Sequence, residues 1–173
     1  MVATGHGAET RPAVRQDPSP PAWLPLQDAV AGEWAEYETH EGVRLRYEVL
    51  RISGLGVATQ VTTRRGGRLL GQPAKRLDDP TVDLLAAEAN RHGASRTAEP
   101  AVVEAAGRRG SGLLFEDRWT DEEVPYVRRT WVSREVPFLG VVRMELYGGG
   151  ELEARLALVG QGSAGSSDTH ADR

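Results

Sequence analysis

Cysteine is absent from this chain of 173 residues. Disulfide bonds, thiolate metal sites and cysteine nucleophiles are therefore excluded, while the redox compartment stays open. Aromatic residues are scarce, at 6% of the chain, and no apolar run approaches the roughly 20 residues that a membrane-spanning helix needs. Because 27% of the residues are charged, the composition predicts a soluble domain.

An excess of basic residues is also missing. The formal net charge is −4, and a general nucleic-acid binder is usually basic overall, so a nucleic-acid partner is disfavoured. The first residues, Met1 to His6, have neither the charged nor the apolar region of a secretory signal. The expected location is cytoplasmic for the chain as written, or periplasmic or in the cell envelope if a leader was removed.

The common patterns of catalytic and metal sites are absent as well. No G-x-S-x-G serine elbow occurs, and the histidines are scattered without a metal-binding spacing: His6, His40, His92 and His170. One acidic cluster offers oxygen ligands for calcium but lacks the EF-hand spacing, which favours a solvated acidic tip: Glu116, Asp117, Asp121, Glu122 and Glu123. We therefore predict no catalytic residue, no metal site and no cofactor.

Two glycine-containing segments have arginines beside them. The backbone amides of residues 107–112, with the sequence Gly-Arg-Arg-Gly-Ser-Gly, could cradle an anion. That segment matches neither the Walker pattern nor the dinucleotide fingerprint, so an ordinary hairpin loop is favoured. The same caution applies to Arg64, Arg65 and Arg68, which flank a predicted turn at Gly66-Gly67.

Strand periodicity is the main signal that the sequence contains. Three consecutive strands are predicted at 126–133, 140–147 and 151–159, where β-branched and aromatic residues are frequent. Apolar and charged side chains alternate along the last two of these strands. Such alternation is typical of an antiparallel sheet with one solvated face.

The glycines at 148–150 connect the last two of these strands. A two-residue turn would place apolar residues opposite charged ones, so we predict a three-residue turn. Met144 would then pair with Ala154, and Leu146 with Leu152.

The first hairpin is predicted from its charges. A turn at 40–42 joins a strand at 33–39 to a strand at 43–52. With three residues in the turn, opposite charges meet on one face and apolar groups on the other. The expected pairs are Glu38 with Arg44, Glu36 with Arg46, Tyr37 with Leu45, and Ala35 with Tyr47.

One helix is expected, from Asp79 to His92. Asp79 can cap free amides, Pro80 suits the first helical position, and Gly93 suits the end. Proline-rich residues 1–22 and the Gly/Ser-rich residues 161–173 predict disordered tails around a single β-rich domain at 23–160. The predicted fold class is mainly β (α+β): a curved antiparallel sheet or half-barrel of about nine strands, with the helix on its concave side.

The candidate site is apolar. Stripes of apolar side chains from the first hairpin and the last three strands should line the concave side of the sheet. There they form either an ordinary core closed by the helix or a surface that binds an apolar ligand. The candidate ligand-binding residues are Tyr37, Leu45, Tyr47, Val49, Trp131, Met144, Leu146 and Leu156.

Two motifs resemble a group of poorly characterised bacterial proteins, often secreted or lipid-anchored. Residues 32–37 read Gly-Glu-Trp-Ala-Glu-Tyr, similar to the group's G-D-W-x-x-Y opening. Residues 131–143 read Trp-Val-Ser-Arg-Glu-Val-Pro-Phe-Leu-Gly-Val-Val-Arg, similar to its W-V-S-x-x-V-P-x-x-G-V-V-K signature. That group in turn looks like the lipoprotein-carrier half-barrels, in which a curved sheet wraps helices and can hold acyl chains.

The sequence thus leads to two functional hypotheses. The first is a non-enzymatic binding module, similar to lipoprotein carriers, for an apolar or acyl ligand or an apolar peptide. The alternative is a structural or protein-interaction subunit of a bacterial assembly. The expected partner is an apolar ligand or a protein, with no nucleic acid and no membrane span, and the oligomeric state stays open.

Overall fold

The computed structural model describes residues 20–105 and 107–163, which form one antiparallel sheet, one short helix and a 3-10 turn. Most of the two predicted tails, 1–22 and 161–173, lies outside the described residues. The elements are η1 (Pro25–Asp28), β1 (Trp34–Thr39), β2 (Val43–Ser53), β3 (Gly56–Arg65), β4 (Arg68–Leu69), β5 (Ala74–Asp78), α1 (Leu84–Arg91), β6 (Ser95–Ala105), β7 (Arg108–Asp121), β8 (Val124–Val132), β9 (Val141–Gly148) and β10 (Glu151–Gly162).

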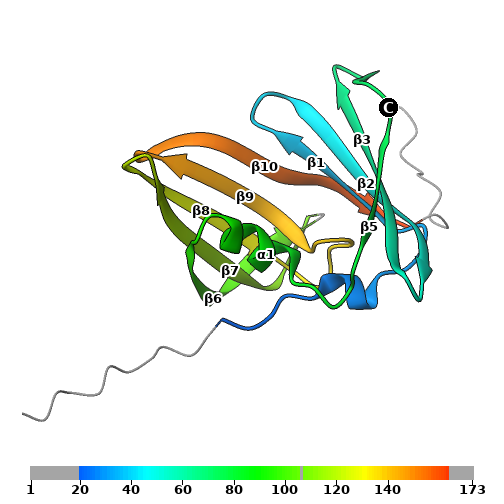
Figure 1. Cartoon of the computed structure of the whole chain (residues 1–173). Coiled ribbons are helices and arrows are strands. Elements are labelled where there is room, and N and C mark those ends of the chain that lie inside the picture. Colours follow the sequence, from blue (N-terminus) through cyan, green and yellow to red (C-terminus); the bar gives the residue numbers. More distant parts are fainter. Residues whose placement is uncertain (1–19, 106, 164–173) are drawn as a thin grey trace, which may run out of the picture.

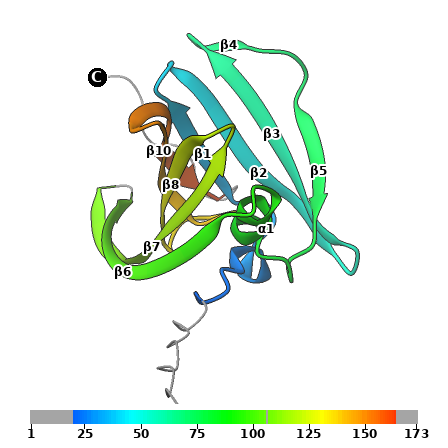
Figure 2. The same ribbon diagram turned by 60° about the vertical axis from the view of Figure 1, so that its left-hand side comes forward.

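Nine of the ten strands follow the order β4-β3-β2-β1-β10-β9-β8-β7-β6, and the tenth, β5, pairs with β3 beside this path. The first and last long strands, β1 and β10, therefore meet in the middle of the sheet. Figures 1 and 2 show a strongly curved sheet that partly surrounds α1 on its concave side. Within the described residues, β6 at one edge does not meet β4 and β5 at the other, so the sheet is not closed into a barrel. The predicted fold class is confirmed.

The strand count differs slightly from the prediction. The segment around Pro73 forms two short strands, β4 and β5, and both pair with β3. Proline cannot donate a ladder hydrogen bond, which explains the interruption.

The first hairpin has the predicted register. All four expected pairs between β1 and β2 are present. Trp34, on the charged face, lies against Gly160 and Gly162 of β10, where a Cβ would stand 3.3 Å and 3.0 Å from the indole. The Arg46 guanidinium covers the ring, 3.9 Å from its centroid. The missing side chains of these two glycines therefore make room for Trp34.

The predicted turn between β9 and β10 is wrong. The turn has two residues, Gly149 and Gly150, both with positive φ. A bulge beside Leu152 then restores the alternation, so that Met144 pairs with Leu156 rather than with Ala154. A bulge adds one unpaired residue and so compensates for the shorter turn.

The predicted start of the helix is also wrong. Asp79 instead forms a local turn, in which its carboxylate accepts hydrogen bonds from the amide and hydroxyl of Thr81. Asp83 is the cap, since its Oδ1 accepts a hydrogen bond from the amide of Ala86. The helix ends where expected, with a positive φ at Gly93.

The predicted loop at 107–112 belongs mostly to strand β7, which begins at Arg108. Gly112 lies within this strand at a crowded position. A Cβ there would stand 2.2 Å from the carbonyl oxygen of Val132 and 2.9 Å from the side chain of Val103. Close packing of neighbouring strands therefore requires this glycine, and no anion-binding loop forms.

The loop between β8 and β9, residues 133–140, lies within the segment from which the resemblance to the bacterial group is predicted. It reaches both faces of the sheet: Val136 packs with Val103 on the convex side, and Phe138 packs with Val49 in the core. Trp23 closes over the loop, donating from its indole nitrogen to the carbonyl of Leu139 at 2.8 Å. The signature thus encodes a structural loop.

Candidate functional site

The concave face of the sheet brings together seven of the eight predicted site residues. The pairs Tyr37–Leu45 and Met144–Leu156 lie within the two hairpins, and the pair Tyr37–Leu158 between β1 and β10 shows that the two stripes share one face. Residues two apart on a strand point to the same side, so the stripes comprise Tyr37, Leu45, Tyr47 and Val49 from the first hairpin, and Met144, Leu146 and Leu156 from the last strands.

Trp131 is the exception, because it does not line the concave face as expected. On β8 it is Thr130 that pairs with Met144, while Trp131 pairs with Arg143 on the convex side. The Arg143 guanidinium lies 5.1 Å from the indole centroid. The indole packs with Val142 and Val103 in a small cluster on that side.

Part of the concave face is core. Tyr37 and Val49 are 2% and 1% exposed. The chain itself covers them with side chains from irregular segments and from α1: Trp23, Leu26, Phe138, Leu84 and Leu85. These two predicted site residues therefore support the fold rather than face solvent.

The remaining five residues are only half-buried, and we call them the concave patch: Leu45, Tyr47, Met144, Leu146 and Leu156. They lie on three strands, β2, β9 and β10. β10 pairs with β9, and β1 lies between β10 and β2. Tyr47 forms the boundary with the core, since its ring stacks on Phe138 at 4.9 Å and meets Tyr37 edge-on at 5.7 Å. An apolar surface of this kind gains free energy when a ligand removes it from water.

A buried ion-pair cluster lies beside the concave patch, and sequence reasoning missed it. Asp117 of β7 is fully buried between two arginines. Arg96 donates through Nε to Asp117 at 2.6 Å, and Arg128 donates through Nη2 at 2.9 Å. Both guanidinium groups also donate to the carbonyl of Leu85, which fixes α1 on the sheet.

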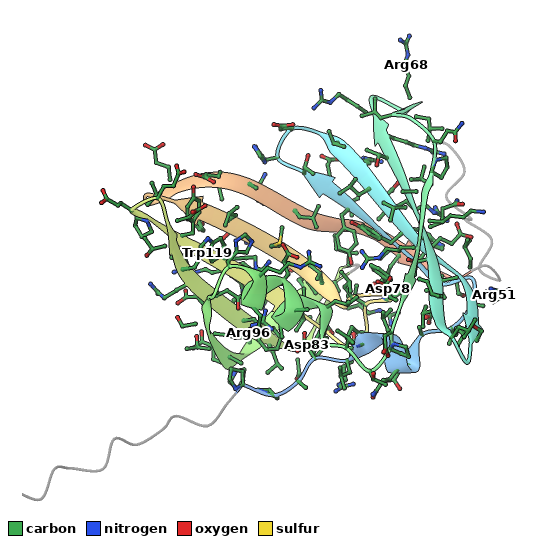
Figure 3. The ribbon with its side chains drawn as sticks, viewed as in Figure 1. Arg51, Arg68, Asp78, Asp83, Arg96 and Trp119 are labelled. Carbon is green, nitrogen blue, oxygen red and sulfur yellow. The ribbon has the colours of Figure 1, made fainter. Side chains whose placement is uncertain are left out.

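The cluster extends to the start of α1 (Figure 3). Asp83 lies 3.9 Å from Arg96 and accepts a hydrogen bond from the backbone amide of Trp23 at 2.8 Å. The Asp83 carboxylate thus caps α1, faces the Arg96 guanidinium and binds the backbone at Trp23. The charges balance, because two arginines meet two aspartates.

The acidic tip predicted from sequence divides in the structure. Only Asp121, Glu122 and Glu123 lie at the β7–β8 turn, where they are exposed. Glu116, next to the buried Asp117, points to the convex face and pairs with Arg129 at 2.9 Å. The hydrogen bond from Arg129 lowers the pKa of this carboxyl.

An aromatic stack stands at the end of α1. The His92 ring lies 4.9 Å from that of Trp119, which lies 5.4 Å from that of Tyr126. The two larger rings come from paired positions on β7 and β8, on the face that carries Asp117. Alternation along the strands places the stack on the concave side, but no sequence pattern connects His92 with it.

The Tyr37 hydroxyl is buried, and it has no hydrogen-bond partner among the described residues. Burial, and next the neighbouring Tyr47, raise the pKa of this phenol above its usual range. The folded protein therefore keeps Tyr37 protonated at a pH where an unfolded tyrosine, with a pKa of about 10, has ionised.

We predict that Tyr37→Phe raises the free energy of unfolding at pH 7 by about 1 kcal/mol, because it removes an unsatisfied buried hydroxyl. The stabilising effect of the protonated phenol is present below pH ~10 and is lost as the pH rises toward the folded-state pKa. The advantage of the variant should therefore grow above about pH 10. Urea unfolding at pH 7 and at about pH 10.5 measures both effects. A loss of more than about 1 kcal/mol at pH 7 would show that the hydroxyl has a partner.

Within residues 20–105 and 107–163, no group of three His, Asp or Glu side chains is placed to hold a metal ion. The two described histidines, His40 and His92, are exposed. No helix of the described chain is both long and apolar enough to cross a membrane.

Comparison with known proteins adds no family to this geometry. No protein-family model matches the sequence, and no curated protein matches it significantly. The resemblance to the bacterial group and to lipoprotein carriers therefore stays a prediction.

Proposed function

We propose that this protein is a non-enzymatic binding module for an apolar ligand, with an acyl chain or an apolar peptide segment as the ligand class. The observation that carries the proposal is the concave patch. Its five side chains stay partly exposed although the curved sheet and α1 partly surround them. Each methylene group that a ligand buries there contributes about 0.8 kcal/mol.

The aromatic stack gives the patch a rigid neighbour. Tyr126 packs over Gly148, where a Cβ would stand 2.8 Å from the ring. The stacked rings of Trp119 and Tyr126 are nearly parallel, at 9°. Flat rings held in this way offer contact area at a small entropic cost, which favours binding of a flexible chain.

Met144→Arg tests this proposal. Met144 lies within the patch, between Thr130 of β8 and Leu156 of β10. A ligand at 100 times its dissociation constant stabilises the wild-type protein by about 2.7 kcal/mol. We expect the variant to lose this stabilisation, because a charge in the patch opposes an apolar ligand. The measurement is a thermal melt with and without a series of fatty acids of increasing chain length.

Val127→Arg is the matched control. Val127 is also half-buried, but it lies on the convex face between Arg118 and Tyr147. Its variant should keep the ligand-dependent shift. Equal loss of the shift in both variants would mean that the ligand does not occupy the concave patch.

The alternative is a structural or protein-interaction subunit. One observation favours it: the chain covers part of the concave face with its own Trp23, Leu26 and Phe138. If no apolar ligand changes the melting temperature of the wild-type protein, the binding proposal fails and this alternative is preferred.

A further inference from the structure

Residues 49–77 contain no acidic side chain, although the chain as a whole is acidic. The segment carries six basic residues: Arg51, Arg64, Arg65, Arg68, Lys75 and Arg76. The other residues hold the remaining 15 of the 21 basic residues and all 25 acidic ones, so their formal net charge is −10 against +6 for the segment. This asymmetry creates a local field opposite in sign to that of the rest of the protein.

The segment forms one edge of the sheet. It includes the end of β2 and all of β3, β4 and β5, beyond which no further strand pairs in the described chain. All six basic side chains are exposed. Figure 3 shows Arg51 and Arg68 at this end of the molecule, with Arg68 extending away from it.

Ion pairs neutralise this edge only weakly. Arg65 lies 3.2 Å from Glu41, but both side chains are more than half exposed, at 57% and 63%. Exposed pairs of this kind contribute little and are screened by salt. Arg76 is held more firmly, by the buried Asp78 at 2.5 Å. The charges at the β3–β4 turn and at the β2–β3 turn therefore stay available to a partner.

The same segment exposes large aliphatic side chains. We call these and the six basic residues together the basic edge: Leu50 (40% exposed), Ile52 (48%), Leu55 (83%), Leu69 (50%), Leu70 (47%) and Leu77 (57%). Two leucines directly follow Arg68 at the β3–β4 turn, and Leu55 stands at the tip of the β2–β3 turn. Cationic and aliphatic groups thus lie together along a single edge of the sheet.

We propose that the basic edge docks on the surface of a membrane that contains anionic lipids. Arginine and lysine near such a surface are attracted to its negative potential, and the leucines enter the boundary between headgroups and acyl chains. A nucleic acid fits less well, because residues 49–77 contain no aromatic side chain on which a base could stack. The concave patch takes no part, so this inference is independent of the proposed ligand.

Vesicle flotation tests the inference on the full chain. The protein should float with vesicles of phosphatidylcholine containing about 30% phosphatidylglycerol, and not with vesicles of phosphatidylcholine alone. The variant R65Q/R68Q should bind the anionic vesicles about thirtyfold more weakly, since each of the two lost cations contributes a factor of roughly five. Raising the salt concentration should weaken wild-type binding because the attraction is screened. L69S/L70S should also weaken binding, although it leaves every charge in place.

R108Q/R109Q is the matched control. These two arginines are exposed at the β6–β7 turn, at the opposite end of the strand order, and their loss changes the net charge equally. This variant should bind anionic vesicles like the wild type. Circular dichroism checks that each variant is folded. The inference is overturned by equal weakening in both arginine pairs, by flotation with neutral vesicles, by no flotation at all, or by tighter binding to a single-stranded oligonucleotide.

Discussion

Asp117→Ala should lower the free energy of unfolding by about 3–5 kcal/mol, because it leaves two buried cations without their shared carboxylate. Asp117 is 0% exposed, and the side chains of Arg96 and Arg128 are each 11% exposed. Without Asp117, the one carboxylate among the described residues that still pairs with Arg96 is that of Asp83, at 3.9 Å. The guanidinium contacts that fix Leu85 and α1 should loosen as well. Urea unfolding followed by tryptophan fluorescence measures the loss.

Glu116→Ala is the control for this prediction. Glu116 is the adjacent residue and also pairs with two arginines, Arg118 and Arg129, but on the convex face. Those arginine side chains are 59% and 42% exposed, so removal of the carboxylate should cost less than about 1 kcal/mol. Equal losses in the two variants would contradict the difference in burial.

A double variant separates charge from packing. If the unpaired cation causes the loss, Arg128→Met in the Asp117→Ala background should cost less than the sum of the two single changes. Residues in one ion-pair network commonly show such coupling, of about 0.5–3 kcal/mol. Additive losses would mean that the cavity left by Asp117, rather than the cation, destabilises the protein.

Gly140→Ala should produce the second large effect, a loss of about 2–5 kcal/mol that combines backbone strain with overpacking. Gly140 has a φ of +70°, and a Cβ there would stand 2.7 Å from the Trp23 ring and 2.9 Å from the carbonyl oxygen of Ser133. Neither neighbour can move freely. Trp23 is 4% exposed and hydrogen-bonded to Leu139, while the Ser133 amide donates to the Gly140 carbonyl at 2.8 Å.

Gly42→Ala separates the two contributions. Gly42 has nearly the same φ, +74°, but no heavy atom lies within 4 Å of the position that a Cβ would take. We expect it to cost only the strain of a left-handed alanine, about 1–2 kcal/mol. The difference between the two variants in urea unfolding then measures the contact with Trp23 and Ser133. If the variants lose the same amount, the loop does not pack under Trp23 as described.

Local patterns in the sequence determined the strands. The β1–β2 register followed from sequence because a short turn links strands whose charges and apolar groups both alternate, so only one pairing satisfies both faces. Gly93 ended α1 as predicted, because the conformation there suits glycine. The number of such strands and the single helix predicted the curved, mainly β fold.

Local patterns could not predict strand register or the face of a residue where a bulge or a long loop determines them. The β9–β10 register was missed because a bulge beside Leu152 has no clear sequence signal. The side on which Trp131 lies was missed for another reason. Alternation shows only which residues of β8 share a face. The long loop at 133–140 does not determine whether the face that carries Trp131 is also the face that carries Met144.

Sequence by itself determined which residues form strands and which faces of those strands are apolar, since both depend on neighbours along the chain. Only the tertiary structure decided what covers those faces. Trp23 and Phe138 reach the core from irregular segments, and Asp117 is buried because arginines 21 and 11 residues away point to the same place. The free energy of such burial depends on partners that are distant in sequence, and no local pattern encodes which partners meet.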